Sequence, residues 1–128
     1  MKQWKVMGAA ALLTGLLAGG CQSPDCASVR TGTFELVNDN SVPVTIVRND
    51  SLQIETKANT TVEEVYRIFW VDDCTYKAVL HEDSQHTAEK MTLQDTMLIR
   101  ITDTHEDGYA YSLTMGAIRL EGEMVRAQ

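Results

Sequence analysis

The segment Ile68-Phe69-Trp70-Val71-Asp72-Asp73-Cys74-Thr75-Tyr76 decides the fold, because it places two strand-like runs on either side of an acidic turn. Four apolar residues precede the two aspartates. Beyond the aspartates, every second residue is apolar or a cysteine, which is the pattern of a strand with one buried face. This alternating set comprises Cys74, Tyr76, Ala78 and Leu80. The centre of the chain is therefore predicted to be a β-hairpin.

Similar alternation extends outward from this hairpin in both directions. The predicted strands are 31–37, 42–47, 52–55 and 61–71 before the turn, and 74–80, 97–102, 109–115 and 118–124 after it. Short runs rich in Asn, Asp, Ser and Gly separate most of them, which indicates tight turns. The apolar pattern slips at Glu63-Glu64, which predicts a β-bulge there. In the last strand, Ile118, Leu120 and Met124 are predicted to point inward.

The predicted fold is all-β, because no stretch beyond the first 20 residues shows helical periodicity. Eight strands joined mostly by tight turns predict an antiparallel meander. This meander either closes into a small up-and-down barrel, lipocalin-like in general architecture, or stays a strongly curved sheet. Closure removes exposed edges and therefore favours the barrel. Inward aromatic side chains are expected to fill the interior, with lining a ligand cavity as the alternative. They are Tyr66, Trp70, Tyr76, Tyr109 and Tyr111.

Residues 1–20 are expected to be a signal peptide, because two lysines precede an apolar run from Val6 to Ala18 and small residues follow. The run is short for a membrane span, which takes about 20 apolar residues. The sequence Leu17-Ala18-Gly19-Gly20-Cys21 is similar to a lipobox, which directs cleavage before a cysteine and its lipidation. Lipidation of Cys21 is therefore expected, with a plain secretory cut after Gly20 as the alternative.

The cysteine count agrees with this interpretation, since the chain has three cysteines. With Cys21 lipidated, Cys26 and Cys74 remain and are expected to form a disulfide in the oxidising compartment that export implies. Two separate buried thiols are the alternative, and the sequence contains no CxxC redox or zinc pattern. Residues 21–30 are expected to be the lipidated N-terminus and a polar tether, and residues 31–128 a single β domain.

The charge of the mature chain limits its partners. After removal of residues 1–20, 128 − 20 = 108 residues remain, with nine Lys and Arg against 18 Asp and Glu, so the formal charge is 9 − 18 = −9. Scattered basic residues in an acidic domain exclude a nucleic-acid partner. Membrane attachment is expected through the acyl chains of Cys21. The expected location is the outer membrane of the cell envelope, which Gln22 fits, with the periplasmic and surface faces both left open.

Three segments give the chain a resemblance to a known family. They are Thr31-Gly32-Thr33-Phe34, Val47-Arg48-Asn49-Asp50-Ser51-Leu52-Gln53-Ile54-Glu55 and Trp70-Val71-Asp72-Asp73-Cys74-Thr75-Tyr76, in this order. Together they resemble a family of small Gram-negative outer-membrane lipoproteins, over most of the mature chain up to Tyr76. Some members carry a label derived from DNA topoisomerase IV, which an acidic, exported domain gives no reason to accept. The resemblance implies a lipid anchor and a disulfide, and it implies no activity or site residues.

Two regions supply candidate contact or modification sites. The polar, aperiodic run from His81 to Lys90 is predicted to be a loop, in which Glu82, Asp83 and His86 are candidates for contact with a partner protein. These residues lack the spacing of a helical metal site such as HExxH, so no metal is assigned to them. Asp50-Ser51-Leu52 and Asp95-Thr96-Met97 are similar to acceptor sequences of a bacterial O-glycosylation system. Ser51 and Thr96 are therefore candidate acceptors, with ordinary turn residues as the alternative.

The sequence contains no catalytic motif such as G-x-S-x-G, and no free cysteine once the disulfide forms. The paired carboxylates Glu63-Glu64 and Asp72-Asp73 are neighbours in sequence and are interpreted as surface and turn residues. Neither an enzymatic activity nor a cofactor is expected. The predicted function is a non-catalytic binding or interaction role in the envelope, with an unknown envelope protein or small ligand as partner. The alternatives are a carrier of a small apolar ligand and an inhibitor of an envelope-directed enzyme such as lysozyme.

Overall fold

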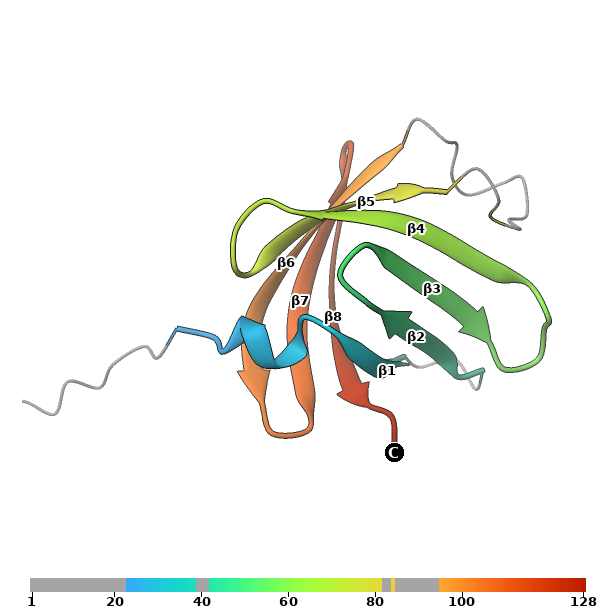
Figure 1. The fold of residues 1–128 in the computed structure, drawn as a ribbon, viewed down its shortest axis with the longest axis horizontal. Helices are drawn as coiled ribbons and strands as arrows, with labels where there is room; N and C mark the ends of the chain where they lie inside the picture. Colours follow the sequence, from blue (N-terminus) through green and yellow to red (C-terminus); the bar gives the residue numbers. More distant parts are fainter. Residues whose placement is uncertain (1–22, 39–41, 82–83, 85–94) are drawn as a thin grey trace, which may run out of the picture.

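The computed structural model describes residues 23–38, 42–81, 84 and 95–128 and shows an all-β domain. Eight antiparallel strands form a closed barrel in which each strand pairs with the next and β8 pairs with β1 (Figure 1). The predicted meander is confirmed, and its ends meet in a barrel rather than leaving a curved sheet. The strands are β1 (Gly32–Val37), β2 (Val44–Arg48), β3 (Leu52–Lys57), β4 (Glu63–Trp70), β5 (Thr75–Leu80), β6 (Thr96–His105), β7 (Gly108–Met115) and β8 (Ile118–Arg126).

The predicted central hairpin is formed by β4 and β5, whose register pairs Trp70 with Tyr76. Asp72 shapes the turn between them, because its Oδ1 accepts a hydrogen bond from the backbone N–H of Cys74 at 2.8 Å. This hydrogen bond stabilises the charged carboxylate and lowers the pKa of Asp72. Asp72 and Asp73 are both exposed, as expected for residues of a turn.

Alternate side chains of the strands fill the barrel in two contiguous groups. The group nearer the N-terminal segment comprises Cys26, Val29, Phe34, Ile46, Ile101, Tyr109 and Met124. The second group comprises Tyr66, Ile68, Tyr76, Ala78, Leu80, Met97 and Ile99. Trp70 and Tyr111 are partly buried and pack against both groups. The aromatic residues predicted to point inward therefore mainly fill the interior.

A short 3-10 helix, η1 (Cys26–Val29), closes one end of the barrel. Its residues Cys26 and Val29 are only 3% and 1% exposed, and they pack against the start of β1 and the first residues of β7. The folded domain therefore begins before the predicted start at Thr31. Within the described part of the chain, no helix is long and apolar enough to cross a membrane.

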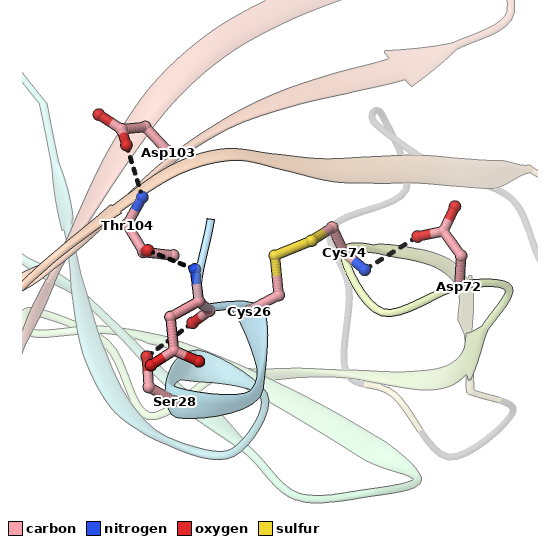
Figure 2. The surroundings of a disulfide bond; sticks show 7 residues. Cys26, Ser28, Asp72, Cys74, Asp103 and Thr104 are labelled. Atoms are coloured by element: carbon pink, nitrogen blue, oxygen red, sulfur yellow. Dashed lines mark hydrogen bonds between the residues drawn. A yellow bond between two sulfur atoms is a disulfide. The ribbon is translucent and has the colours of Figure 1, made fainter. Parts of the chain in front are cut away.

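Covalent and polar contacts both hold η1 in place. The predicted disulfide between Cys26 and Cys74 is present, and it joins η1 to the β4–β5 turn (Figure 2). Beside it, Thr104 Oγ1 accepts a hydrogen bond from the backbone N–H of Asp25 at 2.8 Å. Arg126 Nη2 donates to the carbonyl of Ser28. The N-terminal segment is thus fastened to the β4–β5 turn, β6 and β8.

The predicted bulge at Glu63-Glu64 is wrong. The β3–β4 pairing continues without a register shift from Leu52 and Arg67 to Thr56 and Glu63. The apolar pattern slips here because Glu64 is a polar residue on the inner face of β4, the face that also carries Tyr66 and Ile68. A register shift does occur in β6, between Ile101 and Asp103.

The last strand also differs from the prediction at its beginning. Ile118 and Leu120 were predicted to point inward together with Met124, but their side chains are 51% and 57% exposed. β1 pairs with β8 through the segment 123–126, so the first half of β8 extends past the end of β1. The strands β7 and β8 therefore project as a hairpin at the barrel end opposite η1 (Figure 1).

Replacing both Cys26 and Cys74 with alanine is expected to lower the free energy of unfolding by about 4 kcal/mol, because the bond closes a loop with a sequence separation of 48 residues. Residues 22–128 include η1, all eight strands and both cysteines, so a soluble form of these residues suits the measurement. Urea unfolding followed by the fluorescence of Trp70 gives the change. Dithiothreitol should destabilise the wild type by a similar amount and leave the double variant unaffected. Equal urea midpoints for the oxidised wild type and the double variant would contradict this expectation.

Candidate functional site

The barrel interior carries a polar row on β2 and β3. Arg48 and Gln53 pair across these strands and are 2% and 4% exposed. Glu55 follows on the same face of β3, because alternate residues of a strand share a face. Leu52 and Ile54 alternate with these residues and occupy the outer face. The alternation seen in the sequence of β3 is therefore present, but its polar members point inward.

Arg48 is the centre of this polar row. Its Nε and Nη2 donate to the backbone carbonyls of Arg30 and Val29, at 3.0 and 2.6 Å. Its Nη1 has three side-chain oxygens within 3.2 Å, and these are Gln53 Oε1, the Tyr76 hydroxyl and the Tyr109 hydroxyl. The Tyr76 hydroxyl in turn donates to Gln53 Oε1 at 2.8 Å. One guanidinium thus connects the N-terminal segment to β3, β5 and β7.

The guanidinium of Arg48 remains charged inside the barrel. Burial alone lowers the pKa of Arg48, but its interactions with Tyr76 and Tyr109 outweigh burial and raise it. Burial also raises the pKa of both tyrosines, so their hydroxyls stay protonated. The rings of Phe34, Tyr76 and Tyr109 lie 5.0, 5.2 and 5.4 Å from the central carbon of Arg48, within cation–π distance. Arg48 is therefore a structural cation whose hydrogen bonds are used within the protein.

The barrel end opposite η1 contains a cavity of about 270 Å³. Its lining comes from the ends of β1 to β4 that lie away from η1 and from the β3–β4 turn. The lining residues are Leu36, Val44, Glu55, Lys57, Thr60, Val62 and Glu64. Three aliphatic side chains form its apolar part, and two carboxylates, a hydroxyl and an ammonium group form its polar part. Such a mixed lining is typical of sites that bind small molecules.

Two carboxylates of the cavity lie close to one phenol. Tyr66 is 3% exposed and donates its hydroxyl to Glu64 Oε2 at 2.7 Å. Glu55 lies opposite Glu64 in the β3–β4 register. Burial, reinforced by the negative charge of Glu64, raises the pKa of Glu55 to about 7, although Tyr66 and Gln53 favour its charged form. Burial likewise raises the pKa of Tyr66, so its hydroxyl keeps its proton.

A row of polar side chains runs from η1 toward the cavity. Hydrogen bonds connect the carbonyl of Val29 through Arg48 to Gln53. Glu55 follows Gln53 on the inner face of β3 and lies opposite Glu64. Hydrogen bonds in such networks strengthen one another where water is excluded. The same row of polar side chains therefore fastens η1 and forms the polar side of the cavity.

The site residues predicted from the sequence lie elsewhere. Ser51 is exposed in the β2–β3 turn, where Asn49 Oδ1 accepts hydrogen bonds from the backbone N–H groups of Ser51 and Leu52 at 2.9 and 2.8 Å. Thr96 is exposed at the start of β6. The predicted signal peptide, the predicted lipidation site Cys21 and the candidate contact residues Glu82, Asp83 and His86 lie outside the described residues. Within the described ranges, no group of three or more His, Cys, Asp or Glu is placed to hold a metal ion.

Comparisons with known proteins add no further assignment. No family model matches the chain, and no curated protein or solved structure shows significant similarity to it. The function is therefore inferred from the geometry of the barrel interior.

Replacing Arg48 with methionine is expected to lower the free energy of unfolding by about 3 kcal/mol or more, because buried tyrosine hydroxyls and backbone carbonyls lose their hydrogen-bond donor. Arg67→Met is the matched control, since Arg67 is exposed on the outer face of β4. Urea unfolding of both variants gives the comparison. A similar small effect for the two substitutions would show that the Arg48 network contributes little to stability.

Replacing Glu55 with glutamine is expected to change how stability depends on pH. The pKa of Glu55 rises from 4.5 to about 7 on folding, so between these values the native state binds more protons than the unfolded state. Stability therefore falls as pH rises through this window, and Glu55→Gln removes that fall. The variant should gain about 1–3 kcal/mol over the wild type at pH 8, relative to the difference at pH 5. Urea titrations at several pH values test this, with the exposed Glu63→Gln as a control. Parallel pH profiles for the wild type and Glu55→Gln would refute it.

Proposed function

We propose that the domain is a non-catalytic binding protein that holds a small amphipathic molecule in the cavity at the open end of its barrel. The observation that carries this proposal is the difference between the two ends. One end is closed by η1, the disulfide and the Arg48 network, whereas the other contains a cavity of about 270 Å³ with a mixed lining. A barrel closed at one end and open at the other suits a small ligand that enters from the open side.

The polar groups of the cavity favour binding over catalysis. Glu64 accepts a hydrogen bond from the hydroxyl of Tyr66, and Glu55 is its neighbour across two paired strands. Both carboxylates therefore lie on the same wall of the barrel, with aliphatic side chains from β1 and β2 also lining the cavity. This arrangement orients the polar end of a ligand, which is the usual role of a few polar groups in an apolar pocket.

The proposed setting is the cell envelope, with the domain anchored through lipid on Cys21. The Cys26–Cys74 disulfide supports an exported location, because disulfides persist in oxidising compartments. The segment that follows Cys21 enters the domain at η1, at the barrel end opposite the cavity. A lipid anchor attached there would leave the cavity mouth accessible.

Filling the cavity tests the proposal. The neutral fluorescent probe N-phenyl-1-naphthylamine should bind the 22–128 form saturably and show increased emission in the apolar part of the cavity. Val44→Trp should weaken this binding by about tenfold or more, because Val44 lines the cavity. Val47→Trp is the matched control on the same strand, since Val47 faces solvent and is 45% exposed. No saturable binding to the wild type, or equal loss in both variants, would overturn the proposed function.

A further inference from the structure

We infer that the cavity selects ligands with a cationic head, such as a primary alkylamine, whose ammonium group sits between Glu55 and Glu64 and whose chain lies against Leu36, Val44 and Val62. This inference rests on the proposed function and specifies the ligand class for the same cavity. It follows from the shape of the cavity, the hydrogen-bond balance of its carboxylates and the charges that line it.

The lining of the cavity is divided between aliphatic and acidic residues. Leu36 ends β1, Val44 begins β2 and Val62 precedes β4, so the aliphatic residues come from three segments around the cavity mouth. The two carboxylates come from the paired strands β3 and β4 and lie opposite each other in the register. A ligand in this space meets apolar surface and negative charge together. An amphiphile with a short chain and a compact polar head matches such a surface in a cavity of about 270 Å³.

The two carboxylates outnumber the donors that the protein is seen to offer them. Tyr66 has one hydroxyl proton, and it gives this proton to Glu64 Oε2. When Glu55 is protonated, its own hydrogen is available as a donor. When Glu55 is ionised, two carboxylates lie beside a single phenol proton, and Tyr66, Gln53 and Lys57 are the groups that favour the charged form of Glu55. The ionised pair therefore has acceptor oxygens to spare, and an ammonium group supplies three donors.

The charges around the cavity favour a cationic head over an anionic one. The groups that interact with Glu55 come from several strands around it, and they are Gln53, Lys57, Glu64, Tyr66, Tyr76, Tyr109 and Tyr111. Among the described residues that line the cavity, Lys57 alone is basic, and it is exposed. The tyrosines stay neutral because burial raises the pKa of each hydroxyl. For Tyr111 the pKa rises to about 12. With both carboxylates ionised, the lining carries a net negative charge that repels anionic heads and attracts cationic ones.

Binding of a cation should be coupled to loss of the proton from Glu55. The pKa of Glu55 is about 7 in the free protein, and a bound ammonium group favours the charged carboxylate and lowers it. An alkylamine keeps its charge up to about pH 10, as a lysine side chain does. Affinity should therefore rise with pH through 7 and level off above it. For a cation that binds only the ionised form, affinity at pH 5.5 is about 30-fold weaker than at pH 8.5.

The test compares octylamine, octanol and octanoate, which share a chain and differ in the charge of the head. Isothermal titration calorimetry on the 22–128 form at pH 8.5 should show octylamine binding about tenfold more tightly than octanol, with octanoate weakest. At pH 5.5 octylamine should bind about 30-fold more weakly than at pH 8.5, with proton release that appears as a dependence of the heat on the buffer. Octanol affinity should be nearly the same at both pH values.

Glu55→Gln supplies the decisive variant. It should reduce octylamine affinity at pH 8.5 by about tenfold or more and abolish its pH dependence, while octanol binding changes little. Glu63→Gln, an exposed neighbour, should behave like the wild type. Equal affinities for octylamine and octanol, or an unchanged pH profile in Glu55→Gln, would overturn the inference. If N-phenyl-1-naphthylamine still binds and Val44→Trp still blocks it, the proposed function survives that result. If the probe also fails to bind, the proposed function fails with it.

Discussion

The guanidinium of Arg48 connects the N-terminal segment to three strands inside a closed barrel. A buried charge is unfavourable unless hydrogen bonds compensate it, and Arg48 has five oxygens within reach. Two of these are the carbonyls of Val29 and Arg30, which would otherwise be left near an apolar core without donors. The guanidinium therefore supplies hydrogen-bond donors to carbonyls at the barrel end, and these carbonyls supply acceptors that stabilise the buried charge. The disulfide adds a covalent restraint on the same segment.

This arrangement determines what happens at the other end. Arg48 and Gln53 pair across β2 and β3 and both face inward. Glu55 follows Gln53 two residues later on the same face of β3, so the inner face of this strand is polar. A row of valine or leucine side chains on β3 would have extended the apolar core toward the open end. The polar residues instead leave a cavity between the aliphatic residues of β1 and β2 and the carboxylates of β3 and β4. The inward orientation of the polar residues of β3 thus contributes both to the closed end, through Gln53 and Arg48, and to the cavity, through Glu55.

The strand order and the disulfide could be predicted from the sequence because they depend on local patterns. Alternation, turn residues and the pairing of the two remaining cysteines are all visible in a single chain. The row of polar side chains could not be predicted in the same way, because period-two alternation does not show which set of residues is buried. In β3, Leu52 and Ile54 alternate with polar residues, and this pattern alone does not show that Gln53 and Glu55 are the inward pair. The slip at Glu64 was a usable clue, since a carboxylate at an inward position produces it as well as a bulge does.

The stability of the domain does not explain why a glutamate occupies position 55. Its carboxylate lies at an inward position of a strand, beside a second carboxylate, and burial raises its pKa to about 7. A neutral residue at this position would remove the unfavourable ionisation near neutral pH, and such replacements commonly stabilise proteins. Residues that oppose stability in this way concentrate at functional sites, where a partner supplies the missing interaction. A cationic ligand would supply both the charge and the donors that this pair lacks, so the least favourable feature of the isolated domain becomes favourable in the proposed complex.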